Sequence, residues 1–461
     1  MKRTLWMNLV ALLAAGICRG EADATGSNRE APNVVVPNVV VIVSDDQGYG
    51  DASCYDHAPH VATPNIDRLA SSGVRLTSGY ASAYVCAPTR AGLLTGRYQQ
   101  RFGFYTAGDS RVGLPRSEIT IADVLKKRGY ATGVFGKWHL GLELPYHPLK
   151  RGFDTFYGFL GHGAHDYFKL EKTDDHASIY RDLERVSDTG YLTDNLGREA
   201  VSFIERHRDK PFFLYLPFNA VHWPLQAPAA DIRRFKAGSS ERNTYLAMLH
   251  RMDLAIGKVL DALERSGRAD NTLVIFFSDN GGARKNHANN GKLRDFKQSV
   301  YEGGVRVPFI VRWPASLPRG AVCHEPVSSL DVFPTICAAV GIDLPDDRAY
   351  DGKNFLPVLT GPVLTGPVSG ERAAGPLHEA LFWDGDGGKQ AVRAGKWKWI
   401  NNRGRIELYD LESDLSEATD LAGKRPDVVE RLGKTFRAWR SAMAPRIGTR
   451  QGADSAQRKK R

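Results

Sequence analysis

Two short acidic clusters in the chain have side chains suited to holding a metal ion. Asp45 and Asp46 directly follow one β-branched run, and Asp279 and Asn280 directly follow a second. Carboxylate and amide oxygens are the ligands that a hard cation such as Ca2+ or Mg2+ prefers. Either cluster alone is equally consistent with a turn or a helix cap. The matching positions of the two clusters favour a cation site, and the sequence has no His and Cys group at zinc spacing.

A second candidate centre is the cysteine in the segment YVCAPTRAGLLTGR, residues 84–97. A lone cysteine is usually a small buried apolar side chain. Here Cys86 precedes an expected helix and lies four residues before Arg90, an electropositive setting that favours an anion. The residue types alone indicate a reactive thiol or one that lies beside a bound anion.

Alternating strands and helices are expected to position these groups. The runs 38–43 (NVVVIV) and 272–277 (TLVIFF) are continuously apolar, which is typical of strands covered on both faces. Between them, 245–265 has apolar residues at every third or fourth position and is expected to be a helix. This pattern predicts an α/β fold with a large, mostly parallel sheet between layers of helices. Ligands gather beyond the carboxyl ends of such strands, so the acidic clusters are expected to meet there.

The character of the sequence changes after Pro357. The stretch GPVLTGPVSG indicates a loop or boundary. Beyond it, short strands are expected at 380–383, 390–393, 396–400 and 407–410, followed by a helix at 427–443. We therefore expect a main domain over 25–365, which carries the candidate site, a small α+β subdomain over 366–445 and a basic disordered tail over 446–461.

The composition limits the classes of partner. The chain of 461 residues is 42% hydrophobic and 25% charged, as in globular proteins. Its formal net charge is +10, but the last sixteen residues hold six basic residues against one acidic residue. The body is therefore only mildly basic, and no basic stripe interleaved with aromatic residues occurs in it. No nucleic-acid partner is expected.

The N-terminus has the pattern of a secretory signal peptide. Two basic residues precede a mostly apolar run over 5–17, and the small residues of 22–24 (ADA) follow it. The run is shorter than the roughly 20 residues of a membrane span. We expect a signal peptide over 1–24, no membrane span, and export to the periplasm or the extracellular space. A disulfide between Cys323 and Cys337 is compatible with that compartment.

Several blocks, taken in order, resemble one known family. Cys86-x-Pro88-Thr89-Arg90 followed by Leu-Thr-Gly-Arg is similar to the signature of the formylglycine-dependent sulfatases, with threonine where serine is commoner. The segment from GYAT to GKWHLG over 129–141 resembles the second signature of that family, HWP over 222–224 its histidine-x-proline element, and YEGGVRVP over 301–308 a further block.

The resemblance adds further candidate catalytic residues, which are Lys137, His139, His222 and Lys297. Taken alone, His139 or His222 is by default interpreted as a structural histidine, and Lys137 and Lys297 are also consistent with surface lysines. Lys292 competes with Lys297, and only the spacing of five residues before Glu302 favours Lys297. The order of the blocks along the chain is what makes coincidence a poor explanation.

The resemblance implies a fold, an activity and a modification. The fold would be the alkaline-phosphatase-like α/β fold, and the activity the hydrolysis of sulfuric esters. In that family the cysteine, here Cys86, is oxidised after synthesis to 3-oxoalanine (formylglycine), and the hydrate of this aldehyde is the nucleophile. One Ca2+, or alternatively Mg2+, would be bound per chain. The implied ligands are Asp45, Asp46, Cys86, Asp279 and Asn280.

The resemblance also implies roles for the catalytic residues. Arg90 would steady the hydrate, and Lys137 and His139 would flank it, with His139 the candidate base. His222 and Lys297 would contact the sulfate, and one of them would protonate the departing oxygen. The sequence leaves open which of the two is the acid.

Export and a mildly basic body favour an extracellular sulfated saccharide as the substrate, and a formylglycine-generating enzyme is the implied maturation partner. The loop 161–168 and the side chains of His378, Trp383 and Trp397 are candidate substrate contacts, although structural roles fit them equally well. Two other functions are less favoured. A phosphate-ester hydrolase of the same fold would normally use an unmodified Ser or Thr, so Cys86 in its motif argues against it. A non-catalytic binder of sulfated glycans would have lost turnover, and the intact candidates at every position argue against it.

Overall fold

A computed structural model describes residues 36–55, 60–161, 165–173, 178–360, 364–365 and 375–447. The expected signal peptide, most of the Gly/Pro-rich stretch and residues 448–461 of the expected tail lie outside the described residues. The first two residues of that tail contact the body. The Arg446 guanidinium donates to Asp109 (2.7 Å), and the Ile447 amide donates to the carbonyl of Gly103 (2.9 Å).

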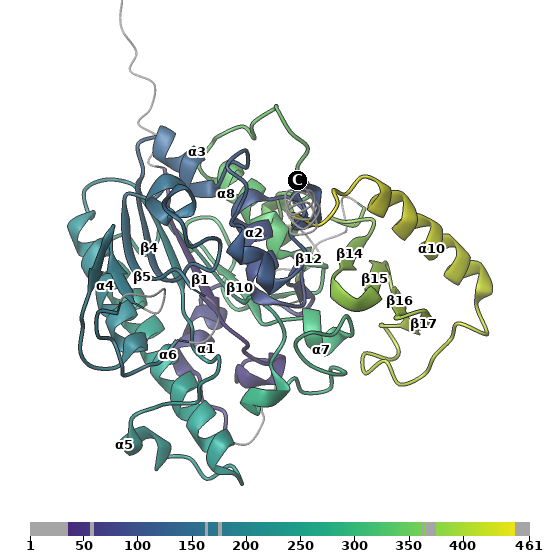
Figure 1. The fold of residues 1–461 in the computed structure, drawn as a ribbon, viewed down its shortest axis with the longest axis horizontal. Helices are drawn as coiled ribbons and strands as arrows, with labels where there is room; N and C mark the ends of the chain where they lie inside the picture. The colour runs from purple at the N-terminus through teal and green to yellow at the C-terminus, as the bar shows by residue number, and fades with distance from the viewer. Residues whose placement is uncertain are drawn as a thin grey trace, which may run out of the picture. The chain divides into compact units, whose positions relative to one another are not determined.

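An eleven-stranded sheet forms the centre of the described chain, in the order β13-β11-β2-β10-β9-β1-β8-β4-β5-β6-β7 (Figure 1). Its middle strands are parallel to one another: β9 (Thr272–Ser278), β1 (Asn38–Ser44), β8 (Phe212–Pro217), β4 (Ala131–Lys137) and β5 (Thr155–Phe159). Antiparallel pairs occur toward both edges. The outer strands are β10 (Phe309–Arg312), β2 (Val74–Leu76), β11 (Ala321–Cys323), β13 (Leu364–Thr365), β6 (Ile179–Arg181) and β7 (Glu184–Val186). The predicted large, mostly parallel or mixed sheet is confirmed.

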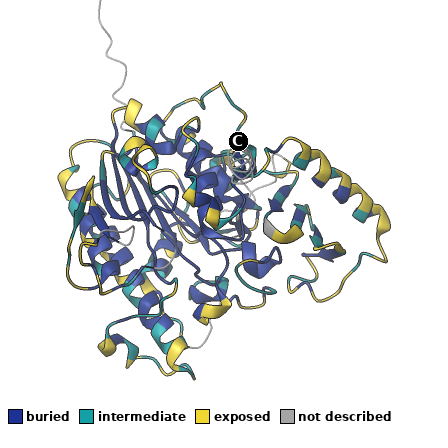
Figure 2. Cartoon of the chain, in the orientation of Figure 1, coloured by how far each residue is buried: buried dark blue, intermediate teal, exposed yellow. Residues whose placement is uncertain are grey.

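Helices cover both faces of this sheet. Val39, Val41 and Val43 of β1 belong to one core with α2 (Cys86–Thr95), α3 (Ile121–Lys127) and α8 (Val332–Ala339). Val40 and Ile42 belong to a second core with α1 (Pro64–Ser71), α4 (Leu192–Arg206) and α6 (Ser240–Arg265). Successive side chains of a strand point to opposite faces, so two covered faces require apolar residues at every position. Figure 2 shows the central strands of the sheet in dark blue, because they are buried along their length.

The C-terminal part is a four-stranded antiparallel sheet with one long helix. The elements are β14 (Leu381–Asp384), β15 (Lys389–Ala394), β16 (Trp397–Asn402), β17 (Arg405–Asp410) and α10 (Pro426–Ser441). Trp399 packs with Phe436 of α10, whereas the neighbouring Ile400 packs with Val300 and Val305 of the main body. All four predicted strands and the helix are confirmed, with bounds shifted by one or two residues.

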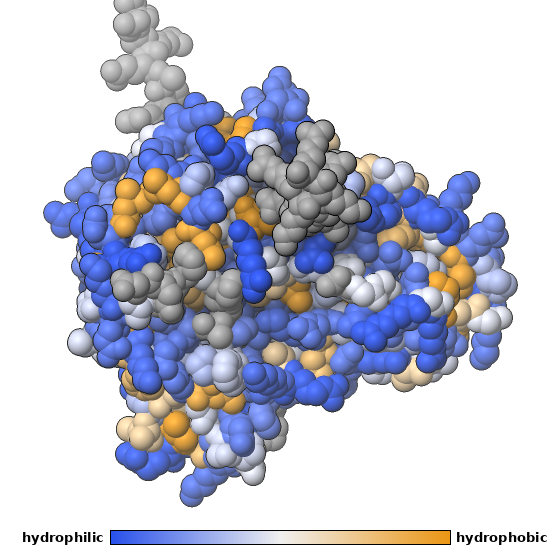
Figure 3. Space-filling model, in the orientation of Figure 1, coloured by the Kyte–Doolittle hydropathy of each residue, from blue (hydrophilic) through white to orange (hydrophobic). Residues whose placement is uncertain are grey.

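The shorter elements are β3 (Gly79–Tyr80), β12 (Val327–Ser328), α5 (Ala229–Ile232), α7 (Glu302–Val305) and α9 (Leu356–Thr360). Cys54, Cys86, Cys323 and Cys337 are free thiols, so the disulfide considered between Cys323 and Cys337 is not formed here. Each helix in the described part of the chain is too short or too polar to cross a bilayer. The face seen in Figure 3 is largely hydrophilic, with scattered hydrophobic patches.

Candidate active site

The two acidic clusters lie side by side at the carboxyl edge of the sheet. β1 and β9 are parallel neighbours, and Ser44 is paired with Ser278 in their register. The next residues, Asp45 and Asp279, therefore leave the sheet together, and the Asp279 amide donates to the Ser44 carbonyl (3.0 Å). Both carboxylates are fully buried. The predicted meeting of the clusters follows directly from this register.

Two further parallel strands bring a lysine and a histidine to the same edge. Lys137 is the last residue of β4, and its Nζ lies 2.5 Å from Oδ2 of Asp45. The loop after β8 carries His222, whose Nε2 lies 3.6 Å from Oδ2 of Asp46. The site is thus assembled from the ends of β9, β1, β8 and β4, which are consecutive in the sheet.

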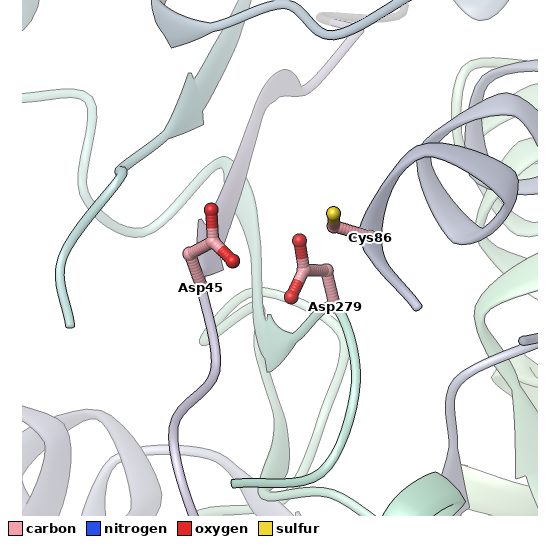
Figure 4. A group of neighbouring side chains, drawn as sticks. All are labelled: Asp45, Cys86 and Asp279. Carbon is pink, nitrogen blue, oxygen red and sulfur yellow. The ribbon is translucent and has the colours of Figure 1, made fainter. Parts of the chain in front are cut away.

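Cys86 enters this group from the first turn of α2. Its side chain points toward Asp45 and Asp279 (Figure 4), and ligand atoms of these three residues lie within 4.8 Å of one another. The Cys86 Sγ is 3.4 Å from Nδ1 of His139. Figure 4 therefore shows a thiol and two carboxylates grouped together, and all three residues are buried.

Arg90 lies one helical turn after Cys86 and faces the same centre, as residues four apart on a helix do. Its Nη2 and Nε donate to Oδ2 of Asp279 (2.7 and 3.0 Å), and its Nη1 donates to the carbonyl of Lys137 (3.0 Å). The guanidinium is fully buried. It therefore holds the end of β4 and the end of β9 in a fixed relation to α2.

The segment around Lys297 approaches the site beside Asp46. The Lys297 Nζ lies 2.5 Å from Oδ1 of Asp46, whereas the competing Lys292 is exposed. The Lys297 amide donates to the Gly282 carbonyl (3.0 Å), and its flanking residues Asp295 and Gln298 have left-handed φ angles of 66° and 69°. Such backbone is seldom found in non-glycine residues and often accompanies a functional site.

The carboxylates respond differently to their shared burial, which by itself raises the pKa of each. Burial is the largest single effect, but the charges of Lys137, His222 and Arg90 together outweigh it and lower the pKa of Asp45. At Asp46 the charges of Lys297 and His222 and the hydrogen bonds from Asn280 and Lys297 together outweigh burial and lower the pKa. Burial and the nearby charge of Asp45 together outweigh Arg90 at Asp279, whose pKa is raised. Three crowded carboxyl groups thus carry a repulsion that a bound cation would relieve.

The donor set fits a hard cation. Oδ1 of Asp45 and Oδ1 of Asn280 are buried, and neither accepts a hydrogen bond from the described residues. Leaving a buried acceptor without a partner costs roughly 1–3 kcal/mol. A divalent ion held by the carboxylates and the Asn280 amide oxygen would satisfy both atoms with ligands of the type that Ca2+ and Mg2+ prefer.

Asn286 was not expected from the sequence. Its Nδ2 donates to Oδ2 of Asp46 (3.1 Å) and to the Val221 carbonyl (3.1 Å), so it ties the loop after β8 to the acidic cluster. It lies in the polar segment ARKNHANN, residues 283–290. No periodicity distinguishes Asn286 from the other asparagines of this segment.

The candidate substrate contacts in the C-terminal part do not line the pocket that reaches Asp46. The His378 Nε2 lies 2.9 Å from both carboxylate oxygens of Asp331. The buried Trp383 donates its indole N–H to the Ala81 carbonyl (2.8 Å). Trp397 is half-buried against Lys396 and Arg425. In the predicted loop 161–168, residues 162–164 lie outside the described residues, while Phe168 is exposed.

Known proteins resemble this chain over most of its length. Residues 37–342 match the family model described as Sulfatase. Human N-acetylgalactosamine-6-sulfatase is 38% identical over 352 residues, which cover 70% of this chain and 66% of the human protein. Mouse steryl-sulfatase is 35% identical over 444 residues, which cover 77% of this chain and 69% of that protein. The chain thus spans about two thirds of the length of these relatives.

A solved structure agrees with the sequence comparisons. The crystal structure of Ps i-CgsB in complex with k-i-k-neocarrahexaose has a TM-score of 0.81 and 34% sequence identity, covering 89% of this chain and 94% of that one. The fold is therefore that of the alkaline-phosphatase-like α/β enzymes, as predicted. Within this class, the chain belongs to the sulfatase family, a family of sulfuric ester hydrolases.

Proposed function

We propose that this protein hydrolyses sulfate monoesters of a saccharide, with a formylglycine derived from Cys86 and a bound Ca2+ or Mg2+. The observation that carries the proposal is the buried group of Asp45, Cys86 and Asp279, whose ligand atoms lie within 4.8 Å of one another. Cationic side chains surround the group, with Arg90 on Asp279 and Lys137 on Asp45. Anion-binding groups next to a cation site suit the chemistry of a sulfate ester.

The proposed cation ligands are Asp45, Asp46, Asp279, Asn280 and the residue at position 86. When bound, a divalent ion would stabilise the negative charge on the sulfuryl oxygens. Support comes from the unpartnered Oδ1 atoms of Asp45 and Asn280. Asn286 would act as a positioning residue, because its side-chain amide donates to Oδ2 of Asp46 and so fixes the orientation of that carboxylate.

The modified residue 86 would supply the nucleophile as the hydrate of its aldehyde. Arg90 would orient residue 86 through its fixed place on α2, since its guanidinium binds both Asp279 and the Lys137 carbonyl. Lys137 would keep Asp45 ionised through its 2.5 Å contact. His139 would take a proton from residue 86, which is supported by the 3.4 Å distance between its Nδ1 and the Cys86 Sγ.

His222 and Lys297 would bind the sulfate on the open side of the site. Both line a pocket of about 590 Å3 that reaches Asp46, which makes them accessible to a substrate. Each therefore remains a candidate for donating the proton to the departing oxygen. Because the His222 Nδ1 is 2.6 Å from the Trp223 carbonyl, the ring is oriented with Nε2 toward Asp46 and the pocket.

The saccharide substrate is proposed from two similarities, to human N-acetylgalactosamine-6-sulfatase and to Ps i-CgsB in complex with k-i-k-neocarrahexaose. A formylglycine-generating enzyme is the proposed maturation partner, since Cys86 needs oxidation to the aldehyde. Export is proposed from the signal-like pattern over residues 1–24.

The test is to produce the protein together with a formylglycine-generating enzyme and to supply Ca2+. Release of sulfate from 4-nitrophenyl sulfate would be compared with release of phosphate from 4-nitrophenyl phosphate, and the peptide that contains residue 86 would be examined by mass spectrometry. We expect sulfate release well above phosphate release and an aldehyde at residue 86. A faster phosphatase, or full sulfatase activity with an intact thiol, would refute the proposal.

A further inference from the structure

The pocket that opens onto Asp46 extends past the catalytic candidates to a group of residues with no assigned role. Its wall includes Trp223, Arg284, Lys285, Asp295 and Phe296. The Trp223 side chain is 43% exposed, a high value for an indole, which is usually largely buried. The volume of about 590 Å3 falls within the range of pockets that enclose small ligands.

The cations on this wall differ in how their charges are balanced. Lys297 is paired with Asp46 (2.5 Å), and Arg284 with Asp295 (3.3 Å). Lys285 has no carboxylate within ion-pair distance in the described part of the chain. Its Nζ lies 3.8 Å from the centroid of the Trp223 ring. A cation on an indole face is held in place without being neutralised.

The chain fixes where this charge lies relative to the proposed sulfate site. His222 Nε2 and Asn286 Nδ2 both approach Oδ2 of Asp46, at 3.6 and 3.1 Å. Trp223 and Lys285 are their immediate neighbours in sequence, and both line the pocket. The ammonium of Lys285 therefore lies on the same pocket as His222 and Lys297, the proposed sulfate-binding residues. A saccharide whose scissile sulfate contacts His222 and Lys297 would present its other substituents to this wall.

We propose that Lys285, held by Trp223, binds a second anionic group of the substrate, so that the preferred substrate is a saccharide with at least two anionic groups. The inference rests on the proposed sulfatase function and narrows its substrate class. A second sulfate ester and a uronic carboxylate share the chemistry that an ammonium recognises. Trp223 also offers an apolar edge or face against which a sugar ring can pack.

The experiment compares three disaccharides with matured enzyme: one with a single sulfate, one with two sulfates, and one with a sulfate and a uronic carboxylate. Wild type is expected to have a higher kcat/KM for the doubly charged compounds than for the singly charged one. Lys285→Gln should reduce the ratio of these two kcat/KM values by about tenfold, mainly by raising KM for the doubly charged compounds. High salt should weaken the preference of wild type, because the charge lies at an open pocket. Comparison of the two doubly charged compounds shows whether Lys285 binds a sulfate or a carboxylate better.

Lys258→Gln is the matched control, because Lys258 is an exposed lysine of α6 and does not line the pocket. It should leave the ratio of wild type unchanged. An equal ratio in wild type and Lys285→Gln would overturn the inference, as would an equal loss for all three disaccharides. Failure of matured wild type to release sulfate from 4-nitrophenyl sulfate would instead overturn the proposed function.

A binding measurement separates recognition from turnover. The Cys86→Ala protein and the same protein with Lys285→Gln added would each be titrated with the three disaccharides by calorimetry. Lys285→Gln should lower the affinity for the doubly charged compounds by about tenfold. Trp223→Ala should weaken binding of all three, while Trp223→Phe should retain most of the preference because a phenyl ring also attracts a cation. Unchanged affinity in the Lys285→Gln background would contradict the inference even if maturation fails.

Discussion

The Sγ of Cys86 lies 3.4 Å from Nδ1 of His139, and both side chains are buried beside Asp45. Burial raises the pKa of the Cys86 thiol, although the ammonium groups of Lys137 and Lys297 act against that rise. A thiol with a raised pKa is largely protonated near neutral pH and is a weak nucleophile. The unmodified cysteine is thus poorly suited to attack an ester, which agrees with its proposed conversion to an aldehyde.

Cys86→Ala is expected to lower sulfate release by about a thousandfold or more, because the proposed nucleophile is removed while its surroundings stay in place. The substitution is small and the residue is buried at the start of α2, so the melting temperature should change little. Sulfate release from 4-nitrophenyl sulfate and a thermal melt check the two parts. Turnover at the wild-type rate would contradict the proposed role of Cys86.

Chelation of divalent ions is expected to abolish sulfate release, and added Ca2+ or Mg2+ to restore it. Binding of the ion should also stabilise the fold, by about 2.7 kcal/mol when its concentration is a hundred times Kd. Thermal melts of the chelated protein with and without each ion measure this effect independently of turnover. Asp45→Asn should reduce the shift, whereas Asp347→Asn, at an exposed residue far along the chain, should preserve it. Full activity in a metal-free sample would contradict the cation site.

Much of the fold could be predicted because a strand covered on both faces requires an apolar residue at every position, which is easily recognised in a sequence. The runs 38–43 and 272–277 are apolar at every position, and the structure places their residues alternately in two cores. The meeting of Asp45 and Asp279 followed from the same argument, since parallel neighbours end at one edge. The C-terminal strands were predicted because turn residues separate short alternating runs.

The contacts that the sequence did not predict are made by side chains in irregular loops or between distant parts of the chain. Asn286 binds Asp46 through a loop whose path depends on contacts with residues far away in sequence, such as Val221. Trp383 and His378 were candidate substrate contacts because side chains of the small C-terminal part could reach the rim of the cleft. Their partners Ala81 and Asp331 come from another part of the chain. Residue type alone does not indicate which side of a packed interface a side chain faces.

His222 is expected to be the residue that protonates the departing oxygen. Lys297 is held in a 2.5 Å ion pair with Asp46, which favours retention of its proton, whereas the His222 Nε2 lies farther from that carboxylate, at 3.6 Å. His222→Ala should therefore reduce kcat/KM much more for a saccharide sulfate than for 4-nitrophenyl sulfate, whose leaving group needs little protonation. Lys297→Ala should reduce both about equally. The reverse pattern would assign the proton to Lys297.

A buried lysine joins the C-terminal sheet to the main body. The Lys398 Nζ of β16 lies 2.6 Å from Oε1 of Glu302 in α7 and 3.2 Å from Oε1 of Glu417. Burial opposes the ionisation of both carboxyl groups. The charges of Lys398 and Arg306 nevertheless lower the pKa of Glu302 to about 2, whereas burial and the nearby Glu302 raise the pKa of Glu417 to about 7. One ammonium shared by two buried carboxyl groups thus leaves Glu417 protonated up to neutral pH.

Glu417→Gln is therefore expected to stabilise the protein in mild alkali. The raised pKa means that Glu417 contributes stability below its ordinary pKa of 4.5, and that this contribution is lost as the pH rises through about 7. Glutamine cannot ionise, and its carbonyl can still accept the Glu302 amide, which now donates to Oε2 of Glu417 (2.7 Å). Urea unfolding should show a variant more stable by on the order of 2 kcal/mol near pH 8, with the difference shrinking toward about pH 4. Glu412→Gln, at an exposed residue, is the control and should leave the stability of the protein close to that of wild type. A constant difference in stability between wild type and Glu417→Gln across this pH range would disprove the raised pKa of Glu417.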